Sequence, residues 1–141
     1  MEIEFYVPGP PKALKRHRHT SKGFTYDPSR NDKQEFILQC RRYKPHVPLY
    51  GPLSLELKFY LPRPKSHFRT GKFADQLKPG SPTMHTTKAD LSNLVKFVED
   101  AFNGEFYRDD AEICVLTATK VYCEPGKYPR TQILLTTLNK D

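Results

Sequence analysis

The sequence predicts an α+β fold in which a small mixed β-sheet packs against two main helices. Four segments alternate apolar with polar or β-branched residues, as strands with one buried face do. Two other segments repeat apolar residues every three or four positions, as amphipathic helices do. The chain of 141 residues is expected to be a single domain, 1–141, with one core and no internal repeat.

The N-terminal part is predicted to form a strand, a basic loop and a helix. EIEFYV alternates, and the PGPP motif that follows ends the strand because proline cannot donate to a β-ladder. SRNDKQEFILQCRRY carries a short apolar stripe, with Ser29 or Asn31 as its cap. The predicted segments are a strand at 2–7, a loop or irregular hairpin at 12–26 and a helix at 29–43.

The remainder is predicted to form a strand, a long loop, a second helix and two further strands. PLSLELKFYL is the clearest strand pattern, and the loop after it is long enough to suggest a function. In the second helix, six apolar residues recur on one face, and Gly104 sits where a left-handed cap belongs. The predicted segments are strands at 52–61, 112–122 and 130–138, a loop at 62–87 and a helix that starts near residue 90.

Composition excludes several classes of protein. Mean hydropathy is −0.69, and no apolar run approaches the roughly 20 residues of a membrane span. The N-terminus lacks the order of a signal peptide, so an intracellular location without a membrane partner is expected. The three cysteines are widely spaced and lie in no zinc-binding pattern, which favours free thiols.

Charge is segregated along the chain, whose formal net charge is +7. Two basic loops, 8–30 and 62–88, hold twelve basic and two acidic residues, whereas the rest holds eleven basic and fourteen acidic ones. Basic loops neutralise phosphates and gain affinity by counterion release, so a polyanion is the expected partner; two solvated loops are the alternative. The candidate DNA-binding residues are Lys12, Lys15, Arg16, Arg18, Lys22, Arg63, Lys65, Arg69, Lys72 and Lys88.

This basic chain nevertheless gathers seven carboxylates within residues 90–112. Clustered carboxylates repel one another, and an oxygen-binding cation such as Mg²⁺ offsets that repulsion. Ser92, Lys96 and Asp100 form one stripe of the second helix because they are spaced four residues apart. If the chain is still extended where this helix begins, Asp90 and Ser92 face one point. Basic loops, metal-binding acids and a lysine together describe a phosphodiesterase.

Each member of this set also has a plainer explanation. Asp90 could be a helix N-cap, and Asp109 and Asp110 could be part of an ordinary turn. Lys96 and Asp100 could be a surface ion pair of little energetic weight. Their joint occurrence beside two basic loops favours the metal site.

The stretch ADLSNLVKFVEDAFNGEFYRDDAEI resembles the signature of the RusA-type Holliday junction resolvases. That signature is approximately K-P-D-x-D-N-L-x-K, then D-A-L-N-G and, after a short spacer, D-D-x-Q-I. Looser similarity extends over nearly the whole chain, through the PGPPK motif, the strand LELKFYLPRP and the ending with Lys120, Tyr122 and Pro129-Arg130-Thr131. The spacing of these motifs is specific, and the chain is identified as a member of this family.

The resemblance implies a RusA-like homodimer that is a Mg²⁺-dependent endodeoxyribonuclease, with Mn²⁺ as a substitute metal and no small-molecule cofactor. Its implied substrate is four-way junction DNA, resolved by symmetric paired nicks during recombination, repair or replication in a bacterium or a phage- or virus-infected cell. A two-fold dimer suits two equivalent scissile strands. The resemblance implies Asp90, Lys96 and Asp110 as catalytic residues and Asp90, Ser92, Asp100, Asp109 and Asp110 as the candidate metal ligands.

Ser92 departs from the family pattern, because it stands where the second aspartate of the motif belongs. A neutral hydroxyl is a weaker ligand for a hard cation than a carboxylate, although serine caps a helix about as well as aspartate. Ala89 likewise replaces the usual proline. The alternative function is therefore a catalytically weak or inactive protein that binds DNA junctions without cutting them. A third, weaker alternative is a general RNA- or single-strand-binding domain that uses Tyr and Phe to stack on bases.

Overall fold

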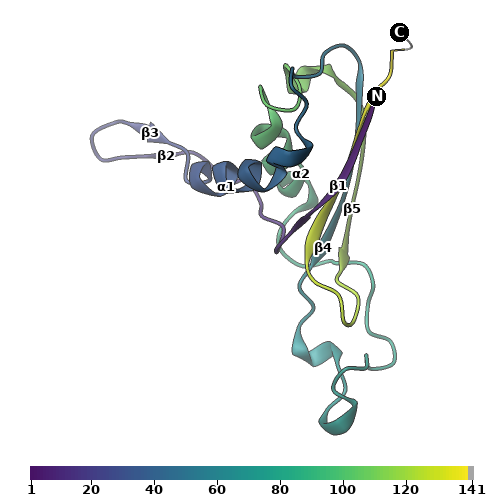
Figure 1. Ribbon diagram of the computed structural model, residues 1–141. Coiled ribbons are helices and arrows are strands. Elements are labelled where there is room, and N and C mark those ends of the chain that lie inside the picture. Colours follow the sequence, from purple (N-terminus) through teal and green to yellow (C-terminus); the bar gives the residue numbers. More distant parts are fainter. Residues whose placement is uncertain (140–141) are drawn as a thin grey trace.

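A mixed β-sheet forms the centre of the protein, and two helices cover one of its faces (Figure 1). The computed structural model describes residues 1–139. The four strands lie in the order β1-β6-β4-β5, with β4 parallel to β5 and the other neighbours antiparallel. This confirms the α+β class and the mixed sheet. The strands are β1 (Glu2–Pro8), β4 (Leu53–Leu61), β5 (Ile113–Tyr122) and β6 (Arg130–Thr137).

The core lies between the sheet and the helices α1 (Arg30–Cys40) and α2 (Leu91–Phe102). Alternate residues of β4, from Leu53 to Leu61, are buried because they face the helices. Phe102 at the end of α2 is fully buried, and its ring centroid lies 4.2 Å from that of Phe106 and 5.8 Å from that of Phe36. The apolar stripe predicted for the second helix is therefore the face that α2 packs on the sheet.

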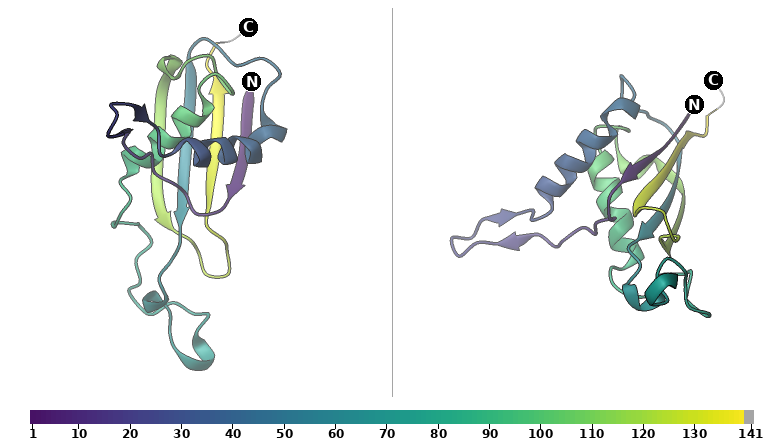
Figure 2. Two further views of the ribbon diagram at one scale, coloured as in Figure 1. Left: turned by 90° about the vertical axis from the view of Figure 1, so that its left-hand side faces the viewer. Right: turned by 60° about the horizontal axis from the view of Figure 1, so that its bottom comes forward.

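Both basic loops project from this body (Figure 2). The first carries a short hairpin, β2 (Arg18–His19) paired with β3 (Thr25–Tyr26), which extends from the helical side of the molecule. The second extends beyond one end of the sheet and contains only two short 3-10 turns, Lys65–His67 and Gly71–Phe73. The hairpin alternative for the first loop is thus correct, and the second is irregular as expected.

The last two strands show a strand order that was not predicted and a burial pattern that departs from the predicted alternation. β5 and β6 follow one another through a Pro-Gly turn, yet β4 lies between them in the sheet. In β5, an edge strand, residues 114–117 are exposed in succession instead of alternately. Within residues 1–139, no helix combines the length and apolar character that crossing a membrane requires. The three cysteines are free thiols.

Replacement of Phe102 by alanine is expected to lower the free energy of unfolding by about 3–5 kcal/mol, because a cavity would remain among the buried rings. Leu38→Ala is the control, since Leu38 lies on α1 and is 61% exposed. It is expected to change stability by less than about 0.5 kcal/mol. Urea denaturation measures both values. Similar effects of the two substitutions would contradict this account of the core.

Candidate active site

Asp90 lies where both basic loops join the body. The loop 62–87 leads directly into it, and α2 begins at the next residue. The first basic loop is held beside it, because the amide of Leu14 donates to the carbonyl of Asn93 over 2.9 Å. Asp90 occupies the N-cap position, yet its exposed side chain makes no cap hydrogen bond in the described part of the chain. Its carboxylate therefore stays available for another ligand.

A lysine that sequence reasoning did not select holds the segment before Asp90 in place. Lys120, on β5, donates from Nζ to the carbonyls of Thr87 and Ala89, each over 2.7 Å. One ammonium therefore ties the end of the long loop to the sheet and brings positive charge next to Asp90. Lys120 belongs to the family-like ending of the sequence, but only the fold reveals that it reaches this segment.

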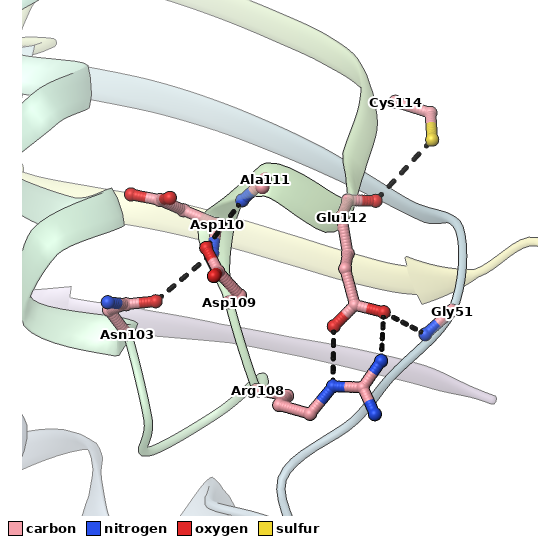
Figure 3. Close-up of polar contacts among 8 residues, drawn as sticks. All are labelled: Gly51, Asn103, Arg108, Asp109, Asp110, Ala111, Glu112 and Cys114. Carbon is pink, nitrogen blue, oxygen red and sulfur yellow. Dashed lines mark hydrogen bonds and ion pairs between the residues drawn. The ribbon is translucent and has the colours of Figure 1, made fainter.

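The other acidic residues gather at the opposite end of α2. Asp110 is joined to the end of the helix, because its amide donates to Asn103 Oδ1 over 3.0 Å (Figure 3). Asp109 accepts from the amide of Ala111 over 2.9 Å and so caps the turn that leads into β5. The turn expected for this aspartate pair is therefore present, with the carboxylate of Asp110 beside it.

Electrostatic repulsion is concentrated at this end. Partial burial, a hydrogen bond with Asp109 and the charges of Asp109 and Asp100 raise the pKa of Asp110. Partial burial and the charge of Asp110 also raise the pKa of Glu99. The charge of Lys96 lowers this pKa but offsets the increase only in part. Both carboxyls are therefore held in surroundings that disfavour their charge, and a bound cation would relieve that repulsion.

Asp100 differs from its neighbours because it has a cationic partner. Lys33 of α1 lies 2.7 Å from Asp100 Oδ2 and also pairs with Asp27. Although partial burial disfavours its charge, hydrogen bonds with Asp100 and Asp27 raise the pKa of Lys33. The pair joins α1, α2 and the base of the β2–β3 hairpin, so Asp100 has a structural role.

Within one copy of the chain, the acids do not assemble into a metal site. Asp90 and Asp100 stand at opposite ends of α2, about 15 Å apart along the helix axis at 1.5 Å per residue. Asp110 lies beside the latter end. Across residues 1–139, no three His, Cys, Asp or Glu side chains gather closely enough to hold a metal ion. Ser92 lies in the first turn of α2 and is exposed. The extended geometry considered for Asp90 and Ser92 is therefore absent.

Most candidate DNA-binding side chains are exposed on the two loops. Lys12 forms a 2.9 Å ion pair with Asp32, and Arg69 lies over the ring of Phe73. Arg63 is the exception, since its guanidinium donates to the carbonyls of Cys123 and Pro82 and helps to fix the base of the loop. The exposed residues are Lys12, Lys15, Arg16, Arg18, Lys22, Lys65, Arg69, Lys72 and Lys88.

The family model described as Endodeoxyribonuclease RusA matches residues 8–136. The chain belongs to the RusA family. A Bacillus subtilis (strain 168) protein named "Uncharacterized protein YqaN" is 33% identical over 138 residues, which cover 94% of each chain. Membership assigns the chain to a family of endodeoxyribonucleases that resolve Holliday junctions.

Several residues around the RusA-like motif escaped prediction from the sequence. Glu99 and Asn103 lie within the motif but carry no individual signal, and their proximity to Asp110 depends on how the chain turns after α2. Lys33 looked like one of many surface lysines. Its role follows from the contact between α1 and α2.

Glu99→Gln is expected to raise the melting temperature at pH 7 slightly, because it removes one of the mutually repelling charges. The folded-state pKa of Glu99 is raised, so the native state binds more protons and loses stability as pH rises through that pKa. The gain should accordingly vanish in acid, where Glu99 is protonated in both states. Thermal unfolding from pH 3 to 8 tests this, with Glu35→Gln on the exposed side of α1 as control. A lower melting temperature at pH 7 would contradict the electrostatic account.

Proposed function

We propose that this protein is a Mg²⁺-dependent, structure-selective endonuclease that resolves four-way DNA junctions by paired nicks. The main support is the position of Asp90 at the point where both basic loops join the body. Its carboxylate is exposed and makes no cap hydrogen bond with α2. Loops that bind phosphates would bring a strand to this residue. Lys96, one turn beyond Ser92 on the exposed side of α2, would stabilise negative charge on the phosphate.

We further infer that the protein acts as a homodimer joined along β5. β5 is an edge strand, so one of its sides has no neighbouring strand of the sheet. Segment 83–85 pairs with the end of that side, through Lys120 and Tyr122. For residues 113–119, no segment within 1–139 pairs with that side. These residues are uncharged, and Val115 and Leu116 are 48% and 47% exposed. An uncharged, exposed edge strand is suited to pair with its own copy about a two-fold axis.

The backbone pattern of β5 supports an axis close to Leu116. The carbonyl of Lys120 and the amide of Tyr122 bond to segment 83–85, so even-numbered residues direct their backbone groups to this side. Antiparallel pairing about Leu116 would join residues 113–119 of the two copies. It would bring residue 110 of one copy toward segment 83–85, which covers residue 122 of the other. The partner's Asp110 would then approach the end at which Asp90 lies.

A shared site of this kind would reconcile the metal requirement with the separation of the acids. Asp90 of one copy, with Asp109 and Asp110 of the other, would supply the carboxylate oxygens that Mg²⁺ prefers. When bound, the metal would activate water and neutralise the phosphate. The raised pKa of Asp110 in the single chain is consistent with a carboxylate that awaits a cation.

Asp90→Asn or Asp110→Asn is expected to abolish paired nicking of a synthetic four-way junction in Mg²⁺ or Mn²⁺ while binding is kept or strengthened. Loss of a negative charge favours the approach of a polyanion, so the mutants should still retard the junction in a gel. Glu35→Gln removes one charge elsewhere and should cut like the wild type. Absence of nicks by the wild-type protein at every metal concentration would refute the nuclease.

Ser92 supports a second candidate, a junction-binding protein that does not cut. Its neutral hydroxyl takes the place of a family carboxylate, and it is exposed in the first turn of α2. This candidate predicts tight junction binding by the wild type without cleavage, and cleavage by the Ser92→Asp variant. The same junction assay therefore separates the two functions.

Mixing the two inactive variants tests whether the site is shared. A heterodimer of Asp90→Asn and Asp110→Asn chains would keep one intact site, made from the unaltered Asp90 and Asp110, and should nick one strand of the junction. Each variant alone should be inactive. If both acids acted within one copy, no mixture would recover nicking. Subunit exchange confirmed with differently tagged chains is the necessary control.

A further inference from the structure

The β2–β3 hairpin forms an arm, residues 15–26, that has no buried residue. Every residue of this arm is exposed, and it extends away from the body on the side of the helices (Figures 1 and 2). At its base, the amide of Lys15 donates to the hydroxyl of buried Ser29 over 2.9 Å. Ordering a chain costs conformational entropy, and this arm recovers little of it through packing. A binding partner would account for its retention.

Local hydrogen bonds nonetheless give the tip of the arm a defined shape. The amide of Thr20 donates to the carbonyl of Phe24, and the amide of Phe24 donates to the hydroxyl of Thr20 over 3.1 Å. Gly23 allows the turn, because its φ of +83° lies in the left-handed region that favours glycine. The tip is therefore built to present the residue that follows this glycine.

That residue is Phe24, whose side chain is 68% exposed. Tyr26, two residues further along, is 47% exposed. Single exposed apolar residues are common, but here the exposed ring stands at the end of a projecting hairpin, where it covers no part of the core. An aromatic ring in this position offers a flat surface for stacking.

The charge of the arm identifies the kind of partner that would accept this ring. Four basic residues and two histidines lie within 15–26, and the arm holds no acid. A nucleic acid with an unstacked base fits both features of the arm. Its phosphates would bind the basic residues, and its base would stack on the aromatic ring. Intact duplex offers no free base face, whereas a branch point does. The basic residues are Lys15, Arg16, Arg18 and Lys22.

We propose that the arm is a wedge that recognises the branch point, with Phe24 stacking on a base face that the open branch point exposes and the basic residues binding the adjoining phosphates. The arm extends about 20 Å from its base, for six residues at about 3.3 Å each. Its base lies beside the first turn of α2, so the wedge can reach the branch while Asp90 faces a nearby strand. The wedge rests on the proposed function, because it explains how branched DNA would be preferred over duplex.

The test compares Phe24→Ala with Leu38→Ala, which removes a similarly exposed apolar side chain from α1. Binding is measured without divalent metal, so cleavage plays no part, on a four-way junction and on duplex of the same sequence. Phe24→Ala should weaken junction binding by about 5- to 100-fold, the effect of losing one base-stacking contact, and leave duplex binding unchanged. Phe24→Trp should restore it, and Leu38→Ala should bind both DNAs like the wild type.

Fluorescence of 2-aminopurine at the branch point provides a direct readout of stacking. Wild type and Phe24→Trp should change its emission, whereas Phe24→Ala should not. Three results for Phe24→Ala would overturn the wedge. They are an equal loss of affinity for junction and duplex, unchanged junction binding, and a loss of binding explained by a change in dimerisation alone. If the wild type cuts junctions but Phe24→Ala binds normally, the wedge alone fails. If the wild type binds no junction at all, the proposed function fails with it.

Discussion

The packing of α2 against the sheet is the constraint on which the rest of the structure depends. Its apolar stripe, including Leu94, Val98 and Phe102, is fully buried, so the helix can take only one orientation about its axis. That orientation turns Ser92 and Lys96 to solvent. Because a helix is rigid, it also holds Asp90 about 15 Å from Asp100. The separation of the acidic residues therefore follows from the same contacts that stabilise the core.

The two edge strands of the sheet differ in how readily they could pair with another chain. β1, at one edge, carries Glu2 and Glu4 and ends at Pro8, features that discourage pairing with another chain. β5, at the other edge, has no charge before Lys120. The edge at β5 is therefore better suited than the edge at β1 to the pairing proposed above. In the proposed dimer, isologous pairing would join the β5 edges of the two copies to each other.

Much of the fold could be predicted because local patterns and burial agree. The alternation of LSLELKFYL and the stripe of α2 each describe an element that packs against the other. Strand order could not be predicted in the same way, since β5 and β6 are consecutive in sequence but separated in the sheet by β4. Order depends on the long crossover that carries α2, and no local pattern encodes that crossover.

For the candidate site, the sequence could predict which residues take part but not where they lie relative to one another. The motif supplied Asp90, Lys96 and Asp110, and the predicted helix already lay between Asp90 and Asp110. Spacing along the chain does not reveal, however, whether the chain brings these two acids back together after α2. Contacts between segments that are distant in sequence could not be predicted either. Lys120 reaches the carbonyl of Ala89 across 31 positions, and Lys33 reaches Asp100 across 67.

The separation of the acids also changes how the substitution at Ser92 should be understood. In a site confined to one copy, Asp90 would be the one candidate carboxylate ligand at its end of α2, and loss of a neighbouring acid would leave a metal with too few ligands. In the proposed shared site, the turn of the partner contributes Asp109 and Asp110, so three carboxylates remain after serine replaces aspartate. The neutral hydroxyl also leaves less negative charge beside the basic loops, which favours the approach of the phosphate backbone. A serine at this position is therefore compatible with catalysis in a dimer, whereas the same residue in an isolated chain would argue for binding alone.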